Sequence, residues 1–266
     1  MALRRWGLRI LVGVTVLAAL GAAGIAVWGS TPLGPTERAV AALQSDDAVL
    51  VSANDWITFE PAQSAPSMGL IFYPGARVDP RSYAPLTRAI AADGVLVVVV
   101  PMPLNFAIFA PNRADAVLIA YPSISTWAIA GHSLGGAMAA RYAYQHVDAV
   151  DGLVLWASYP PSTDDLTNRD DLVGLSIYAT LDGLTDDAEI TASRQLMPSR
   201  TCWTEIVGGN HAQFGDYGAQ GGDSAATISA DDQQAQIVSA TTGFLSLLNQ
   251  MEMGGEFNCT LIGGLE

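Results

Sequence analysis

The segment TWAIAGHSLGGAMAARYAYQH occupies residues 126–146. Its first residues are rich in β-branched and aromatic side chains, and an alanine-rich stretch typical of a helix follows Gly136. Between them lies Gly131-His132-Ser133-Leu134-Gly135, so the order is strand, sharp turn and helix. In this setting the serine of a G-x-S-x-G pattern is an exposed nucleophile, and the glycines prevent Cβ clashes between strand and helix. The alternative is a glycine-rich helix start capped by a serine.

Strand and helix patterns alternate along the rest of the chain. Residues 48–59 have the pattern of a β-hairpin. Strands are expected at 68–73, 95–100, 153–157, 175–179 and 201–207, and helices at 80–92, 113–121, 186–196 and 231–248. The alternation predicts an α/β fold with a mostly parallel sheet, whose ligands bind at the carboxyl ends of the strands. With 266 residues the chain fits one such domain, at residues 37–266.

The N-terminus carries an apolar segment. Residues 10–28 contain no charge, and arginines precede them. A helix of this length spans about 28 Å, close to the roughly 30 Å hydrocarbon core of a bilayer. We therefore expect a transmembrane anchor over residues 1–28, a Gly/Pro/Thr linker over 29–36, and an extracytoplasmic domain. A cleaved secretory signal is the alternative because residues 19–23 are small, and the paired arginines also fit a twin-arginine export signal.

The cysteines and the charge limit the classes of partner. Cys202 and Cys259 are the only cysteines, and both follow the apolar segment. In an exported chain this predicts a disulfide, with two free buried thiols as the alternative. Neither has a histidine at zinc-ligand spacing, and we expect no metal or organic cofactor. The formal net charge of −14 argues against nucleic acid as a partner.

A serine nucleophile needs a base, and the chain has three histidines. His132 adjoins Ser133, so its side chain diverges from that of the serine. His146 closes the same helix, where a helix-end role is the simpler interpretation. His211 lies in the glycine-rich run 208–215 directly after the last expected strand, at the sheet edge where the serine emerges. His211 is therefore the predicted base, and a solvent-exposed loop histidine is the alternative.

The base needs an acid that orients its ring. Asp182 follows the expected strand at 175–179, so its carboxylate belongs to the same sheet edge. Asp186 and Asp187 compete with it, but both lie where the first turn of a helix favours acids. Asp182 is the predicted acid.

Two backbone amides are expected to bind the developing oxyanion. One belongs to Leu134, at the start of the serine helix, and the other to Ala76, where Gly75 permits close approach of the backbone; an ordinary Pro-Gly turn is the alternative at Ala76. The short segment 158–172 leaves little room for a lid. Candidate pocket residues at the strand ends are Met102, Phe106, Phe109, Tyr159 and Phe214.

The chain resembles the α/β-hydrolases, and within them the small dienelactone-hydrolase-like branch of bacterial exported proteins. The likeness is carried by residues 72–79, 101–105, 131–136, 180–184 and 208–215. The order Ser133, Asp182, His211 is the order of catalytic residues in that fold. Dienelactone hydrolases have a cysteine where this chain has Ser133, so the departure points to ordinary esters.

The resemblance implies hydrolysis of esters through an acyl-enzyme. The apolar pocket candidates predict acyl chains of short to medium length. Two alternatives remain at this point. One is an acyltransferase or thioesterase acting on cell-envelope components, which would use the same three residues. The other is a non-catalytic binding protein on a hydrolase fold, which is disfavoured because all three positions are filled. The expected partners are a small-molecule ester and, through the N-terminal helix, a membrane.

Overall fold

The computed structural model describes residues 2–262. Its centre is an eight-stranded sheet in the order β1-β2-β4-β3-β5-β6-β7-β8. The strands are β1 (Val49–Ala53), β2 (Ile57–Pro61), β3 (Met68–Tyr73), β4 (Leu96–Val99), β5 (Thr126–His132), β6 (Gly152–Trp156), β7 (Val173–Ala179) and β8 (Thr201–Ile206). The helices are α1 (Ala2–Gly29), α2 (Glu37–Ala41), α3 (Ala84–Ala92), α4 (Ala114–Ala120), α5 (Leu134–Gln145), α6 (Asp187–Ser193) and α7 (Ala230–Glu252).

The sheet is parallel from β4 to β8 and antiparallel at its first edge. β1 and β2 form the expected hairpin, and β2 pairs antiparallel with β4. The remaining neighbours, from β4 through β3 and β5 to β8, all pair in parallel. Every residue of β3, β4, β5 and β6 is buried, as continuous apolar strands between two helical layers should be. The mostly parallel α/β fold expected from the alternation is confirmed.

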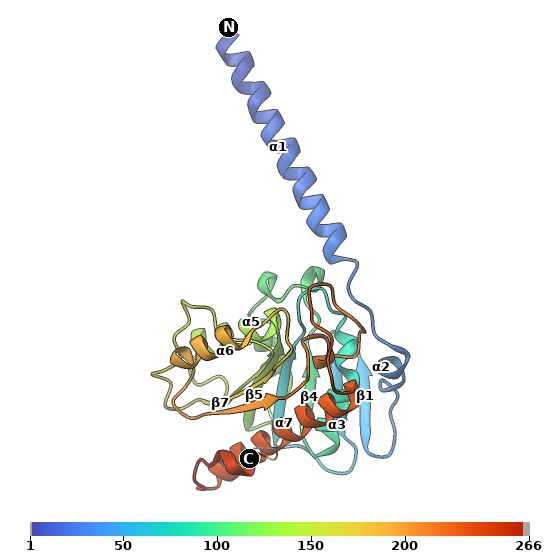
Figure 1. The fold of residues 1–266 in the computed structure, drawn as a ribbon, viewed down its shortest axis with the longest axis vertical. Helices are drawn as coiled ribbons and strands as arrows, with labels where there is room; N and C mark the ends of the chain where they lie inside the picture. Colours follow the sequence, from blue (N-terminus) through green and yellow to red (C-terminus); the bar gives the residue numbers. More distant parts are fainter. Residues whose placement is uncertain (1, 263–266) are drawn as a thin grey trace.

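Alternate residues of the strands feed two separate cores. Leu70 and Phe72 face the layer of α3 and α7, where they meet Leu86 and Phe244. Ile71 faces the other layer, with residues of α4 and α5. Figure 1 shows α3 and α7 together on one face of the sheet, with α5 and α6 on the other. The two-residue period of the strands thus decides which helix each side chain meets.

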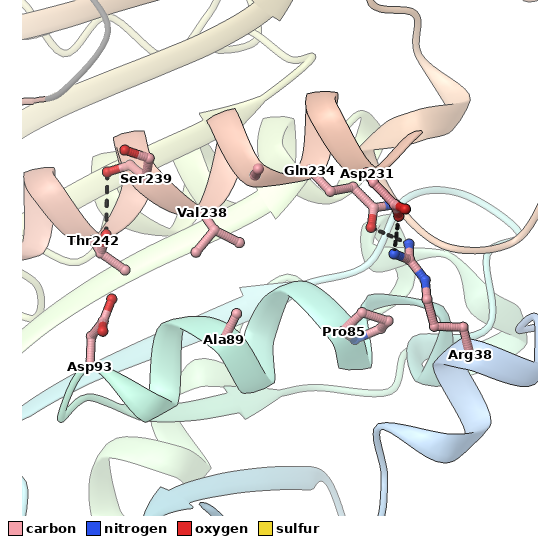
Figure 2. Close-up of a pocket in the computed structure, with 10 residues that line it drawn as sticks. Arg38, Pro85, Ala89, Asp93, Asp231, Gln234, Val238, Ser239 and Thr242 are labelled. Atoms are coloured by element: carbon pink, nitrogen blue, oxygen red, sulfur yellow. Dashed lines mark hydrogen bonds and ion pairs between the residues drawn. The ribbon is translucent and has the colours of Figure 1, made fainter. Parts of the chain in front are cut away.

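A shallow hollow of about 560 Å³ lies between α3 and α7. Figure 2 shows that Arg38 closes one end of it, where the guanidinium contacts Asp231 and Gln234, while Asp93 lies at the other end. The side chains between these ends are mainly small or apolar. Because neither Ser133, Asp182 nor His211 lines this hollow, it is separate from the predicted catalytic residues.

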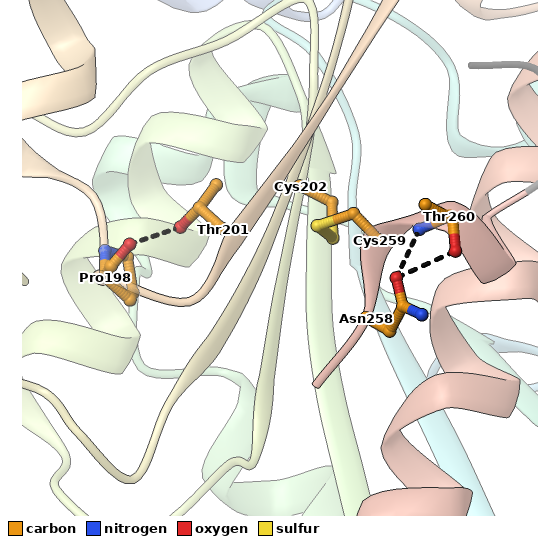
Figure 3. The surroundings of a disulfide bond; sticks show 6 residues. All are labelled: Pro198, Thr201, Cys202, Asn258, Cys259 and Thr260. Atoms are coloured by element: carbon orange, nitrogen blue, oxygen red, sulfur yellow. Dashed lines mark hydrogen bonds between the residues drawn. A yellow bond between two sulfur atoms is a disulfide. The ribbon is translucent and has the colours of Figure 1, made fainter. Parts of the chain in front are cut away.

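The expected disulfide is present. Cys202 on β8 is bonded to Cys259, which lies beyond the end of α7 (Figure 3). The bond joins the last strand of the sheet to the C-terminal tail across 57 residues of sequence. In the chain-entropy model, closing a loop of this length stabilises the fold by about 4 kcal/mol.

Two observations concern the N-terminal region. Residues 2–29 form the helix α1, which extends away from the sheet in Figure 1. Within the part of the chain that the structure describes, no helix meets the length and hydropathy needed to cross a membrane, so the expected anchor is not shown. The linker at 29–36 is held to the domain, because Leu33 forms a parallel bridge with Val78 and the Thr36 amide donates to Asp216. The composition of this segment predicts an irregular backbone, but it does not predict which backbone groups of the domain the segment contacts.

Candidate active site

Ser133 occupies a strained turn between β5 and α5. Its φ is 53° and its ψ is −127°, a region that residues with a Cβ rarely adopt. The glycines on either side permit this turn. A Cβ on Gly131 would lie 2.4 Å from the carbonyl carbon of Gly135, and one on Gly135 would lie 2.1 Å from the carbonyl oxygen of Tyr73. The Ser133 side chain makes no capping hydrogen bond to α5, so the serine is not a conventional N-cap.

His211 and Asp182 form a buried pair. The His211 Nδ1 lies 2.8 Å from the Asp182 Oδ2, and each side chain is 1% exposed. The other carboxylate oxygen accepts the amides of Leu184 and Thr185, at 2.8 and 2.7 Å. An ionised carboxylate only accepts hydrogen bonds, so Nδ1 carries the proton and Nε2 keeps its lone pair. Among the described residues this buried Nε2 has no hydrogen-bond partner. The ring therefore has one fixed nitrogen and one available to accept a proton.

The competing carboxylates serve the next helix. Asp186 caps α6: its side chain accepts the amide of Glu189, whose own side chain accepts the Asp186 amide. Asp187 is exposed in the first helical turn. His146 lies at the end of α5, where its ring stacks on Tyr142 at 4.3 Å between centroids. These three residues are therefore not part of the buried pair.

Ser133 faces a hollow of about 240 Å³. Its lining comes from the start of α5, from residues 157–159, and from Leu184 and Thr185, which follow Asp182. Residues 157–172, which follow β6, contain no helix or strand. The lining residues are Ser133, Leu134, Ala137, Ala157, Ser158, Tyr159, Leu184 and Thr185.

Of the five aromatic and methionine side chains expected to line the pocket, Tyr159 does so. Met102 and Phe214 are buried in the two cores instead. Phe106 packs against Trp28 and Phe109, and Phe109 is 54% exposed. All lie near the carboxyl ends of strands, but their direction depends on packing against distant segments. Apart from Leu184, the lining residues that the sequence did not single out are small, and none of them carries a compositional signal.

Of the two amides predicted to bind the oxyanion, that of Leu134 belongs to a residue that lines the hollow, whereas that of Ala76 does not. Leu134 is the first residue of α5, where a helix leaves its amide without an intrahelical acceptor. The Gly75 amide donates to the Tyr83 hydroxyl at 2.9 Å, so it is already occupied. The next amide, that of Ala76, donates to no acceptor within residues 2–262. The close approach of Gly135 to Tyr73 brings these two backbone segments together, which is compatible with the predicted oxyanion-binding pair.

His132 packs against the ring of the predicted base, His211. It is fully buried, and its ring lies 4.5 Å from the His211 ring and stacks on Phe214. Its Nδ1 is hydrogen-bonded at 2.9 Å to the Tyr83 hydroxyl, which also accepts the Gly75 amide. Burial, followed by the neighbouring His211, lowers the pKa of His132 well below its usual value. A neutral imidazole thus connects the serine turn, the predicted base and the Gly75 turn.

The sequence profile described as the "Alpha/beta hydrolase family" matches residues 69–235, more than half of the chain. The chain belongs to the α/β-hydrolase family. The match extends from β3 into α7 and includes Ser133, Asp182 and His211. It does not distinguish branches within the family, so the dienelactone-hydrolase-like branch stays a prediction.

Solved structures of similar fold include lipolytic enzymes and esterases. A structure from work on the metagenome-derived lipolytic enzymes LipS and LipT is 12% identical, with a TM-score of 0.53, over 68% of this chain and 94% of that one. The esterase domain of a Rhodothermus marinus protein is 12% identical, with a TM-score of 0.53, over 74% and 96%. A ferulic acid esterase from Streptomyces cinnamoneus is 18% identical, with a TM-score of 0.54, over 70% and 68%. At such identities the likeness establishes the fold. No curated protein matches the sequence.

Proposed function

We propose that this α/β-hydrolase is a serine esterase that cleaves carboxylic esters of short to medium acyl chains through an acyl-enzyme. The observation that carries the proposal is the buried His211–Asp182 pair. His211 Nδ1 lies 2.8 Å from Asp182 Oδ2, and Nε2 has no hydrogen-bond partner among the described residues. An oriented imidazole whose second nitrogen is unpaired suits the role of a general base. The strained turn at Ser133 and the esterases among the structures of similar fold support the same reaction.

The reaction proceeds in two halves. His211 Nε2 takes the proton of Ser133 as the serine oxygen attacks the acyl carbon, and the amides of Leu134 and Ala76 bind the resulting oxyanion. The imidazolium then protonates the leaving alcohol, so an acyl-serine remains. Water, deprotonated by the same nitrogen, attacks the acyl carbon and releases the carboxylic acid and the free serine. Asp182 keeps Nδ1 protonated and the ring oriented throughout.

The dimensions of the hollow support small acyl groups. Its volume of about 240 Å³ lies below the roughly 300 to 1,000 Å³ typical of small-molecule pockets. Ala137, Ala157 and Leu184 provide apolar lining, whereas no arginine contributes to it. An uncharged short acyl chain fits this lining better than a substrate that carries an anionic group.

The proposal is tested by labelling and turnover. A fluorophosphonate probe should modify Ser133, and Ser133→Ala should abolish both labelling and hydrolysis of a nitrophenyl acyl ester. Ser64→Ala, at an exposed position, serves as the control and should leave both unchanged. A folded wild-type protein without an adduct, or a Ser133→Ala variant that still hydrolyses the ester, would contradict the proposal. Adding an alcohol acceptor distinguishes hydrolysis from acyl transfer, because a transferase would divert the acyl product.

We also propose that the domain works outside the cytoplasm. The Cys202–Cys259 disulfide supports this because such bonds persist in oxidising compartments. Protein isolated from its native cells in the presence of a thiol-blocking reagent should contain no free thiol. Two blocked cysteines would contradict the proposal. The mass of the same sample distinguishes an intact N-terminus from one that starts within residues 22–29.

A further inference from the structure

One carboxylate contacts both of the loops that carry the proposed acid and base. Asp223 Oδ1 accepts the amide of Gly183 at 3.0 Å and that of His211 at 3.3 Å. Its Oδ2 accepts the amide of Ala212 at 2.8 Å. Gly183 directly follows Asp182, and Ala212 directly follows His211. A single side chain therefore bridges the backbone beside each member of the buried pair.

The segment around Asp223 is packed tightly against the acid loop. A Cβ on Gly183 would lie 2.8 Å from the Gly222 carbonyl oxygen and 2.8 Å from the Ser224 amide nitrogen. On the other side, the Asn210 side chain donates to the Ser224 carbonyl at 2.7 Å. The run 222–224 thus lies between the two loops and is bonded to each.

This bridge begins where the sheet no longer connects the loops. The backbone contacts that continue from β7 and β8 end with the Leu181 amide donating to the Gly209 carbonyl at 3.0 Å. Beyond that point, the described hydrogen bonds that link the two loops are the Asp182–His211 contact and those made through Asp223. The imidazole–carboxylate geometry therefore depends on a third side chain that holds both backbones.

We propose that Asp223 is a positioning residue that keeps Asp182 and His211 in register. The inference rests on the proposed esterase function. The Leu184 and Thr185 amides are bound by Asp182 itself, whereas the intervening Gly183 amide is bound by Asp223. Without that acceptor the Asp182–His211 contact alone joins the turn at 182–185 to the base loop, and the carboxylate shifts relative to Nδ1. Hydrogen bonds to an ionised acceptor are stronger and more directional than neutral ones, which suits this role.

The first test compares Asp223→Ala and Asp223→Asn with Asp187→Asn in the full chain. Asp187 is an exposed acid in α6 and provides the control for loss of one charge. Asp223→Ala should lower kcat for a nitrophenyl ester by about 10- to 100-fold, as a misplacement near 1 Å does, while KM changes less than about twofold. The kcat of Asp223→Asn should lie between those of wild type and Asp223→Ala. The side-chain oxygen of asparagine can still accept backbone amides of one loop, whereas its NH₂ group cannot accept those of the other. Asp187→Asn should match wild type.

A second readout does not require turnover. The His211 Nδ1 proton shared with Asp182 should give a low-field proton NMR resonance, which Ser133→Ala and Asp187→Asn retain and Asp223→Ala loses through faster exchange. If the wild type hydrolyses no ester but Asp223→Ala still abolishes the resonance, the proposed function fails and the positioning role stands. Wild-type kcat together with an intact resonance in Asp223→Ala overturns the inference. Should that variant not fold, the same pair of results in Asp223→Asn overturns it.

Discussion

Replacing Ser133 by glycine is expected to yield a more stable protein than replacing it by alanine. Both changes remove the hydroxyl, which makes no capping bond, so they differ mainly in the backbone. At φ 53° and ψ −127° a residue with a Cβ is strained by about 1 to 3 kcal/mol, whereas glycine adopts the conformation freely. Glycine loses about 0.5 to 1 kcal/mol more conformational entropy on folding. The net difference should favour Ser133→Gly by about 1 kcal/mol.

Thermal and urea unfolding of the two variants, with the disulfide intact, measures this difference. For a domain of this size 1 kcal/mol corresponds to about 2 to 4 °C in Tm. The control pair is wild type and Ala235→Gly, at an exposed position within α7. At position 235, glycine should lower the free energy of unfolding by about 1 kcal/mol relative to alanine. This change is opposite in sign to the one expected at position 133. If Ser133→Ala proves as stable as Ser133→Gly or more stable, the strained-turn interpretation of Ser133 is wrong.

Three further predictions concern the acid, the disulfide and the buried histidine. Asp182→Asn should lower kcat by about three to four orders of magnitude, because its amide favours the wrong tautomer of His211; a comparable loss in Asp186→Asn instead would reassign the acid. Replacing both cysteines by serine should lower the free energy of unfolding by about 4 kcal/mol in urea titrations, and an unchanged midpoint would rule out this contribution. The pKa of His132 is lowered in the folded state, so below about pH 6.5 the unfolded chain binds one proton more than the folded protein. The free energy of unfolding therefore falls as the pH drops, by up to about 1.4 kcal/mol per pH unit. His132→Gln should remove that part of the slope between pH 7 and pH 5, and an identical slope in the variant would refute it.

Local pattern was sufficient for most of the fold. The uniform burial of β4 follows from its run of β-branched residues, and the hairpin of β1 and β2 follows from alternation around a polar turn. Gly131 and Gly135 were expected to allow close packing, and the distances that a Cβ would have at both positions agree. Such features depend on neighbours within a few residues, which a linear sequence displays directly.

The contents of the site were harder to predict. The pairing of His211 with Asp182 was expected from their positions after neighbouring strands, and the structure places them 2.8 Å apart. The pocket lining was largely missed, because Met102 and Phe214 turn into cores whose partners lie far away in the chain. The roles of His132 and Asp223 also had no local signal.

The amino-acid sequence by itself determined the strand–turn–helix around Ser133, the alternation of strands and helices in the α/β fold, and the order of Ser133, Asp182 and His211 along the chain. These depend on backbone preferences and on side-chain periodicity, which act over one or two turns of chain. Only the tertiary structure decided that the Tyr83 hydroxyl meets His132, that Asp223 links two loops, and which side chains line the hollow. Such contacts join residues distant in sequence, and their geometry arises only when the sheet and its two helical layers pack together.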